Sequence, residues 1–392
     1  ECISHPDFEN LPFFAFLQKG IRMSKSAIVF YIALFLAVAN ASILGIDFGT
    51  QFMKIAIVRP GSPFEIVTDL SSKRKTPAAV IFDDSTRTYG YDALTLGARK
   101  PKNVFMRMSR LLGQGPKSDL VNEFKELKFP YEFKLTERNT WAVKFPAGTG
   151  FDDVEYLTAE EINAMILDYA RNMGVLFDNG QQIVDCVVTV PSYFTQHERQ
   201  AVLDAASLAG LNVLSLIDET TAAALQYTVN KEFVNKTHRV MFYDMGAGSI
   251  QVSIAEFHTS IDKKTKLPKR YVDVLSKAWD ENMGGAYLSQ ILADQFMKDF
   301  MSQHDLDPRG NPKVEYRLRA LGEKLKEVLS VNDKLPVNEG TLFDERDLST
   351  MATKQFIVDN SEAITKRLVA PALRALEDAH LTIVASEVET HR

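Results

Sequence analysis

The stretches Ile46–Thr50 (IDFGT) and Tyr243–Ser249 (YDMGAGS) repeat one design and decide the fold. In each, a strand-like run ends in an aspartate, a glycine follows two residues later, and an alternating apolar pattern then resumes. The two aspartates are separated by 244 − 47 = 197 residues, which is far longer than the unit of a solenoid repeat. The spacing instead predicts a duplicated lobe, with one such hairpin in each copy.

Each hairpin contains the residue types that bind phosphate. Glycine lets the backbone approach a phosphate closely, and successive N–H groups of a tight turn form an anion-binding nest. The hydroxyl groups of Thr50 and Ser249 add donors, and the carboxylates of Asp47 and Asp244 are suited to hydrated Mg²⁺. One Asp-x-Gly alone is better explained by an ordinary turn. Two matched copies favour a pair of phosphate hairpins that face each other across a cleft.

The sequence between the hairpins alternates strands with helices. Four segments follow one another as strand, helix, strand and helix: 183–190, 197–209, 213–217 and 222–228. That order predicts an α/β fold with a largely buried sheet. Before it, Thr158 and Glu161 form a capping box that opens a long amphipathic helix. No low-complexity linker divides the chain, so we expect one two-lobed unit, with lobes at 42–230 and 231–392.

Two other stretches are predicted to be mainly helical. Leu94–Gly113 is interpreted as mostly helix with a break at Pro101. Beyond Gly285 the helical pattern continues nearly to the end of the chain, with polar breaks at 305–311 and 332–347.

The overall composition is that of an ordinary globular protein. The chain has 392 residues, a formal net charge of −6 and 24% charged residues. This mildly acidic balance, with no Lys/Arg stripe along a helix, gives no electrostatic basis for binding nucleic acid. The two cysteines, Cys2 and Cys186, neither require nor exclude an oxidising compartment.

The start of the chain has the pattern of a secretory signal. From Met23, a short basic region leads into the apolar run Ala27–Ala39 and the small-x-small site Ala39–Ala41 (ANA). This order predicts a signal peptide over 23–41 that is cleaved after its last residue. The apolar run is shorter than the roughly 20 residues of a spanning helix, so we expect no membrane anchor after cleavage. Residues 1–22 are interpreted as a non-native leader.

The hairpins look like the two phosphate motifs shared by actin, sugar kinases and chaperones of the heat shock protein 70 superfamily. Three motifs between them resemble only the chaperones: Val188–Phe194 (VTVPSYF), Arg199–Ala201 (RQA) and Ile217–Ala224 (IDETTAAA). Three more resemble the large endoplasmic-reticulum class, the hypoxia up-regulated and 170-kDa glucose-regulated proteins: Ser71–Pro77 (SSKRKTP), Leu111–Gly113 (LLG) and Met241–Gly246 (MFYDMG). The resemblance covers about 43–389, and it implies a two-lobed, actin-like ATPase fold.

The resemblance also implies ATP or ADP with Mg²⁺ as ligands in a cleft between the lobes. It implies catalytic roles for Glu219 and Asp244, and Mg²⁺ held through water at Asp47 and Asp244. It places nucleotide contacts in both hairpins, in a diglycine turn and in an adenosine-contacting pair: Asp47, Gly49, Thr50, Gln51, Gly246, Ala247, Gly248, Ser249, Gly284, Gly285, Glu323 and Lys326. A helix-entry turn and a surface i,i+3 ion pair are the plain alternatives for the last two groups.

Three positions depart from the pattern of the hydrolytic chaperones. Ser109 stands where the resemblance implies a lysine, Gln251 where it implies an acidic residue, and Gln51 where a second threonine is usual. Phosphoryl transfer depends on positioned charge, and one lost donor of this kind can cost about 10²–10³ in rate. We therefore expect nucleotide binding with slow or absent hydrolysis.

The expected function is that of an ATP-binding chaperone of the endoplasmic reticulum lumen. It would assist protein folding and act as nucleotide exchange factor for the lumenal heat shock protein 70, with unfolded clients bound by a domain beyond this chain. A competent ATPase and a small-molecule kinase are the alternatives. Asn235 is an acceptor for N-glycosylation, and the chain is interpreted as ending before the family's adenosine turn.

Overall fold

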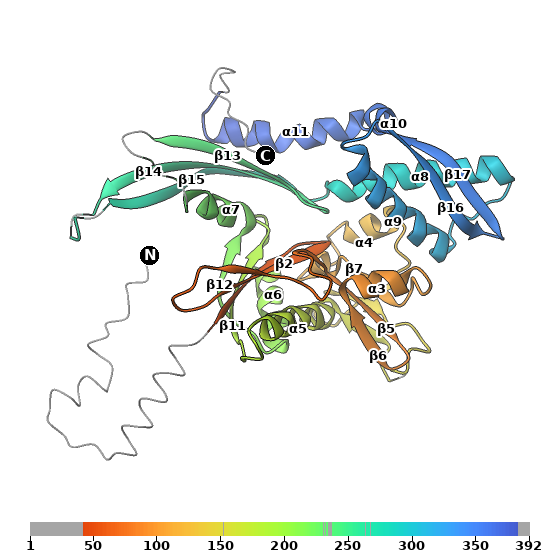
Figure 1. Cartoon of the computed structure of the whole chain (residues 1–392), viewed down its shortest axis with the longest axis horizontal. Coiled ribbons are helices and arrows are strands. Elements are labelled where there is room, and N and C mark those ends of the chain that lie inside the picture. The colour runs from red at the N-terminus through yellow and green to blue at the C-terminus, as the bar shows by residue number, and fades with distance from the viewer. Residues whose placement is uncertain are drawn as a thin grey trace, which may run out of the picture.

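The two predicted hairpins lie in two separate sheets of an α/β fold, as the computed structural model shows (Figure 1). The expected fold class is therefore confirmed. The expected leader, signal peptide and acceptor Asn235 lie outside the described residues, as do residues 383–392. The structure describes residues 42–151, 153–229, 231, 233, 237–262, 264–266 and 268–382.

The first sheet holds the first hairpin at its centre. Its strand order is β12-β11-β1-β2-β3, and β4 also pairs with β2. The strands are β1 (Ile43–Phe48), β2 (Phe52–Val58), β3 (Glu65–Val67), β4 (Thr76–Pro77), β11 (Asp185–Val190) and β12 (Asn212–Asp218). Because β1, β11 and β12 are parallel, their carboxyl ends reach one edge of the sheet. Ligands of open α/β sheets bind at such an edge.

The helices of this region follow the sequence signals closely. The long helix α5 (Ala159–Phe177) begins with the predicted capping box, in which Thr158 Oγ1 accepts a hydrogen bond from the N–H of Glu161 at 3.2 Å. Helix α6 (Gln196–Leu208) packs beside α5. Helix α7 (Glu219–Thr228) starts directly after β12 and packs against the second sheet, where Ala224 joins an apolar cluster.

A smaller strand-rich region extends from the first sheet, and here one helix prediction is wrong. Only Gly90–Gly97 of the stretch around Leu94–Gly113 forms an α-helix (α3). Val104–Met106 instead forms β7, which pairs with β5. This pairing buries Val104 and Phe105, and the burial outweighs the local preference for helix. The other elements are β5 (Ala79–Asp83), β6 (Thr86–Tyr89), the 3₁₀ helix η2 (Met108–Leu111), α4 (Leu120–Glu126), β8 (Phe133–Leu135), β9 (Trp141–Lys144) and β10 (Tyr156–Thr158).

The second sheet carries the second hairpin. It consists of β13 (His238–Met245), β14 (Ile250–Ile261) and β15 (Pro268–Asp280), all antiparallel. Helix α11 (Glu362–Asp378) packs along this sheet, as Figure 1 shows.

The remainder of the second lobe corrects the expectation that, after Gly285, only polar breaks at 305–311 and 332–347 interrupt the helix. Helices α8 (Gly285–His304) and α9 (Pro312–Leu329) are followed by a hairpin, β16 (Lys334–Phe343) and β17 (Arg346–Thr353), and then by α10 (Lys354–Asn360). The hairpin buries Val337, Leu342 and Leu348 against α8 and α9. Helix α9 also reaches the first lobe, where the Tyr316 hydroxyl donates to the Leu94 carbonyl at 2.7 Å.

Candidate functional site

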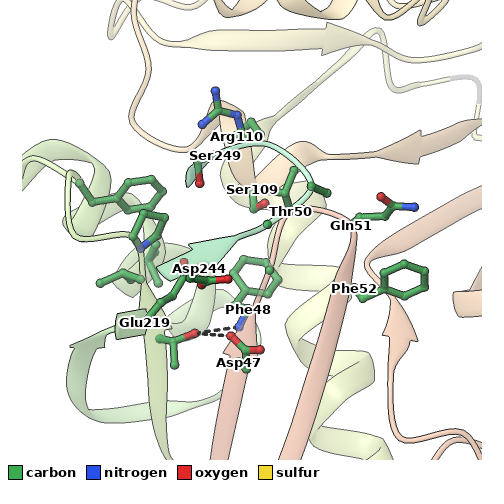
Figure 2. Close-up of a pocket in the computed structure, with 18 of the residues that line it drawn as sticks. Asp47, Phe48, Thr50, Gln51, Phe52, Ser109, Arg110, Glu219, Asp244 and Ser249 are labelled. Atoms are coloured by element: carbon green, nitrogen blue, oxygen red, sulfur yellow. Dashed lines mark hydrogen bonds between the residues drawn. The ribbon is translucent and has the colours of Figure 1, made fainter. Parts of the chain in front are cut away.

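The two hairpins face each other across a cavity of about 170 Å³. Both turns line it, together with the loop after β11 and the start of α7. Figure 2 shows Asp47, Glu219 and Asp244 together at one end of this cavity. The structure therefore brings the two hairpins, whose aspartates Asp47 and Asp244 are 244 − 47 = 197 residues apart, into one place together with Glu219. The shared cavity is the candidate functional site.

The second hairpin is held by the predicted diglycine turn at the start of α8. The N–H of Gly285 donates to the Gly246 carbonyl at 2.9 Å, and that of Ala286 donates to the Ala247 carbonyl at 3.1 Å. A Cβ at Gly284 would lie 2.7 Å from the backbone of Ala247, so only glycine allows this approach. The diglycine turn thus supports the hairpin from behind and is not among the residues that line the cavity.

The two turns also touch each other directly. A Cβ at Gly248 would lie 3.2 Å from Thr50 Cγ2 and 3.2 Å from both Arg107 and Arg110. The turn of the second hairpin therefore lies against both the first hairpin and η2. Ser249, also predicted as a phosphate contact, lines the cavity beside this point.

Asp47 has both carboxylate oxygens engaged. Its Oδ1 accepts a hydrogen bond from Thr189 Oγ1 at 2.9 Å, and its Oδ2 lies 2.6 Å from Lys54 Nζ. Thr189 Oγ1 in turn accepts from the N–H of Phe48 at 3.1 Å, which fixes the end of β1 to β11. The aspartate is thereby oriented by two neighbouring strands.

Lys54 and Gln251 occupy equivalent places in the two hairpins. In the antiparallel ladders, Asp47 is paired with Lys54 and Asp244 is paired with Gln251. Directly opposed residues of an antiparallel pair have their side chains on the same face. Each aspartate therefore has a neighbour on its own face of the sheet, which is a cation in the first hairpin and a neutral amide in the second.

Glu219 is the first residue of α7 and points toward both aspartates. Burial, followed by the negative charges of Asp244 and Asp47, raises the pKa of Glu219 to about 8. Burial and the charge of Asp47 also raise the pKa of Asp244. The preceding residue, Asp218, is held by Arg199 at 2.8 Å and by Lys277, so the helix start is anchored from both lobes.

Gln251 is buried between Glu219 and the loop after β11. Its Nε2 donates to the Glu219 carboxylate, and its Oε1 accepts from the N–H of Ser192 at 2.6 Å. With 2% of its surface exposed, Gln251 is a fixed bridge and adds no charge to the site.

The opposite end of the cavity contains Thr50, Ser109, Arg110 and Ser249, as Figure 2 shows. Ser109 is buried and lines the cavity, so its hydroxyl stands where the resemblance implies an ammonium group. The neighbouring Arg110 is already paired with Glu123 at 2.8 Å and donates to the Tyr193 hydroxyl at 3.0 Å. This end therefore has a cation, but one that is tied to the protein.

Glu323 and Lys326 form a pair on α9 that lies behind the second hairpin. Lys326 Nζ lies 2.9 Å from Glu323 and donates to the Gly285 carbonyl at 3.1 Å. Neither residue lines the cavity of the hairpins. The next residue, Glu327, pairs with Lys75 at 3.3 Å and so links the two lobes.

The cavity-lining residues that sequence reasoning missed include Lys54, Arg110, Thr189 and Tyr193. For Lys54 a signal was available. It follows Asp47 by seven residues, just as Gln251 follows Asp244, so the duplication itself marks both positions. For Arg110, Thr189 and Tyr193 no such repeat exists, because their roles depend on contacts between distant segments.

The donor set fits a polyphosphate better than a directly bound metal. Two glycine-containing turns, hydroxyl groups that include those of Thr50 and Ser249, and Lys54 line the cavity. These groups are hydrogen-bond donors that phosphate oxygens accept. No group of three or more His, Cys, Asp or Glu residues among the described residues could hold a metal ion. Asp47 in particular has its oxygens occupied by Thr189 and Lys54. Mg²⁺ bound through Asp47 thus does not fit the arrangement as it stands.

Comparison with known proteins places this fold and site in a class. The family model for the Hsp70 protein matches residues 43–390. The chain therefore belongs to the heat shock protein 70 family. It is 33% identical over 349 residues to hypoxia up-regulated protein 1 of Danio rerio, covering 88% of this chain and 35% of that protein. The same protein of Gallus gallus is 34% identical over 350 residues, covering 87% of this chain and 34% of the relative.

A plant relative extends the comparison. Heat shock 70 kDa protein 14 of Arabidopsis thaliana is 34% identical over 352 residues, with coverage of 87% of this chain and 40% of that protein. The chain thus spans about a third to a half of the length of the curated relatives it matches. In the part that the structure describes, no helix is long and apolar enough to cross a membrane.

Proposed function

We propose that this chain is the nucleotide-binding domain of a chaperone of the endoplasmic reticulum lumen, formed by lobes at 42–230 and 231–392. In this proposal it binds ATP or ADP but hydrolyses ATP slowly or not at all. It acts mainly on a second chaperone, a lumenal heat shock protein 70, as nucleotide exchange factor. The signal pattern at 23–41 and the similarity to hypoxia up-regulated proteins support the lumenal location. Unfolded clients would bind outside this chain.

The bridge made by Gln251 is the observation that carries the proposal. Its neutral amide fills the space between Glu219 and the N–H of Ser192, where an acidic residue would add a charge. At the other end of the cavity, Ser109 presents a hydroxyl instead of an ammonium group. Because phosphoryl transfer depends on such charges, the cavity keeps the groups for binding and lacks two for catalysis.

The cavity supports a division of roles among its residues. The turns at Gly49–Gln51 and Gly246–Ser249 would hold the phosphates, with Gly284 and Gly285 keeping the second turn in place. Glu323 and Lys326, which do not line this cavity, would contact the adenosine. Bound Mg²⁺ would neutralise phosphate charge, while Asp244 remains the carboxylate best placed to face it.

Hydrolysis tests the first half of the proposal. Single-turnover cleavage of ATP by the full-length protein should be at least about 100-fold slower than that of a standard heat shock protein 70 measured alongside. The double variant Ser109→Lys with Gln251→Asp should recover part of the difference. Hydrolysis by the wild type at the standard rate would refute this half.

Exchange activity tests the second half. A lumenal heat shock protein 70 loaded with labelled ADP should release the label faster when the full-length protein is added. Gly248→Val supplies a contrasting variant, because its side chain would press against Thr50, Arg107 and Arg110 and so separate the hairpins. This variant should accelerate release less than the wild type. Unchanged release with wild-type protein would show that exchange is not its role.

A further inference from the structure

Lys54 is the cation that the candidate site holds at its carboxylate end. Lys75 and Arg110 also line the cavity, but Lys75 pairs with Glu327 across the lobes and Arg110 is buried against Glu123. Lys54 lies on β2 at the carboxylate end, with its side chain 52% exposed. A ligand in the cavity can therefore reach its ammonium group.

The position of Lys54 follows from the hairpin and does not depend on a chance rotamer. It is paired with Asp47 in the β1–β2 ladder, so both side chains project on the same face. The neighbouring residues Met53 and Ile55 are buried on the opposite face, which fixes the direction of the strand. The hairpin thus presents one ammonium group to the cleft for as long as it is folded.

Lys54 remains charged at neutral pH. Burial alone would lower its pKa, but the charge of Asp47, the hydrogen bond to it and the charge of Asp244 raise the pKa above its ordinary value. An ammonium group has three donors, and one of them is used by Asp47. Two donors are left for oxygens of a ligand.

Lys54 also competes with a metal ion for Asp47. Its ammonium group lies 2.6 Å from Oδ2, and Thr189 already donates to Oδ1 at 2.9 Å. A hydrated Mg²⁺ held by Asp47 would have to displace this ammonium group or the Thr189 hydroxyl. In the second hairpin, Asp244 is paired with the neutral Gln251 and has no ammonium neighbour of this kind in its ladder.

We propose that Lys54 is a phosphate-binding residue that takes the place of the divalent cation at Asp47, so that this site binds nucleoside di- or triphosphates without Mg²⁺. The inference rests on the proposed function, since it requires that the cavity bind nucleotide. Lys54 bridges the aspartate and a phosphate as a single positive charge.

The test is the affinity of the full-length protein for ADP, measured by calorimetry in excess Mg²⁺ and in excess EDTA. For the wild type, we expect the two dissociation constants to agree within about threefold. For Lys54→Met we expect at least about tenfold weaker binding in EDTA, with most of the loss recovered in Mg²⁺ because Asp47 Oδ2 becomes available. Lys54→Arg, which keeps the charge, should bind in EDTA more tightly than Lys54→Met.

Lys144→Met is the matched control. Lys144 is also on a strand, is 47% exposed and pairs with Glu132 at 2.8 Å, but it lies outside the cavity. Its affinity should equal that of the wild type in both buffers. The inference would be overturned if the wild type lost its affinity for ADP in EDTA, or if Lys54→Met bound ADP in EDTA as tightly as the wild type does. Either result would leave the proposed function standing. If the wild type bound ADP in neither buffer, the proposed function would fall with it.

Discussion

Replacing Glu219 by glutamine should remove a pH-dependent loss of stability. The pKa of Glu219 is raised from 4.5 to about 8, so the folded protein binds a proton that the unfolded chain releases between these values. Stability therefore falls as the pH rises through this window. The full shift corresponds to about 5 kcal/mol, of which about 2 kcal/mol falls between pH 6 and pH 8. Because Glu219 lines an open cavity, solvent screening reduces the expected loss to about 1–2 kcal/mol.

Glu219→Gln stays neutral at every pH and can still accept the hydrogen bond from Gln251. The assay is urea unfolding of wild type and variant in parallel at pH 6, 7, 8 and 9, because all other titrating groups cancel in the difference. The variant should gain about 1–2 kcal/mol relative to the wild type between pH 6 and pH 8. Glu132→Gln is the control, since Lys144 lowers the pKa of exposed Glu132 and it stays ionised throughout. Parallel profiles for wild type and Glu219→Gln would refute the reasoning.

Two further predictions concern the second hairpin and the start of the mature protein. Gly284→Ala should lower the free energy of unfolding by about 1–3 kcal/mol, because its Cβ would lie 2.7 Å from the backbone of Ala247. Gly45→Ala, whose Cβ would lie 3.8 Å from a side chain, should be tolerated, and equal stability of the two variants would contradict this account. Protein secreted or retained in the lumen of a eukaryotic host should begin at Ser42 when sequenced, and soluble protein with an intact Met23 segment would disprove signal cleavage.

The sequence predicted what depends on local pattern or on repetition. The capping box at Thr158 and Glu161 forms within one helical turn, so both partners are visible in a few residues. The two Asp-x-Gly hairpins are recognisable because the second copy repeats the first. The same duplication could have identified Lys54 as the counterpart of Gln251, since a ladder fixes which residues face each other.

The tertiary structure decided the features whose partners are distant in the chain. Val104–Met106 became a strand because β5 was available to pair with it, and no helical pattern within the segment could show that. The hydroxyl of Thr189 reaches Asp47 across 142 positions, and Gln251 reaches Glu219 across 32. Charges and hydrogen bonds of this kind depend on distance in space. The contacts of Gln251 with Glu219 and Ser192, and those of Asp47 with Thr189 and Lys54, could therefore be seen only in the folded protein.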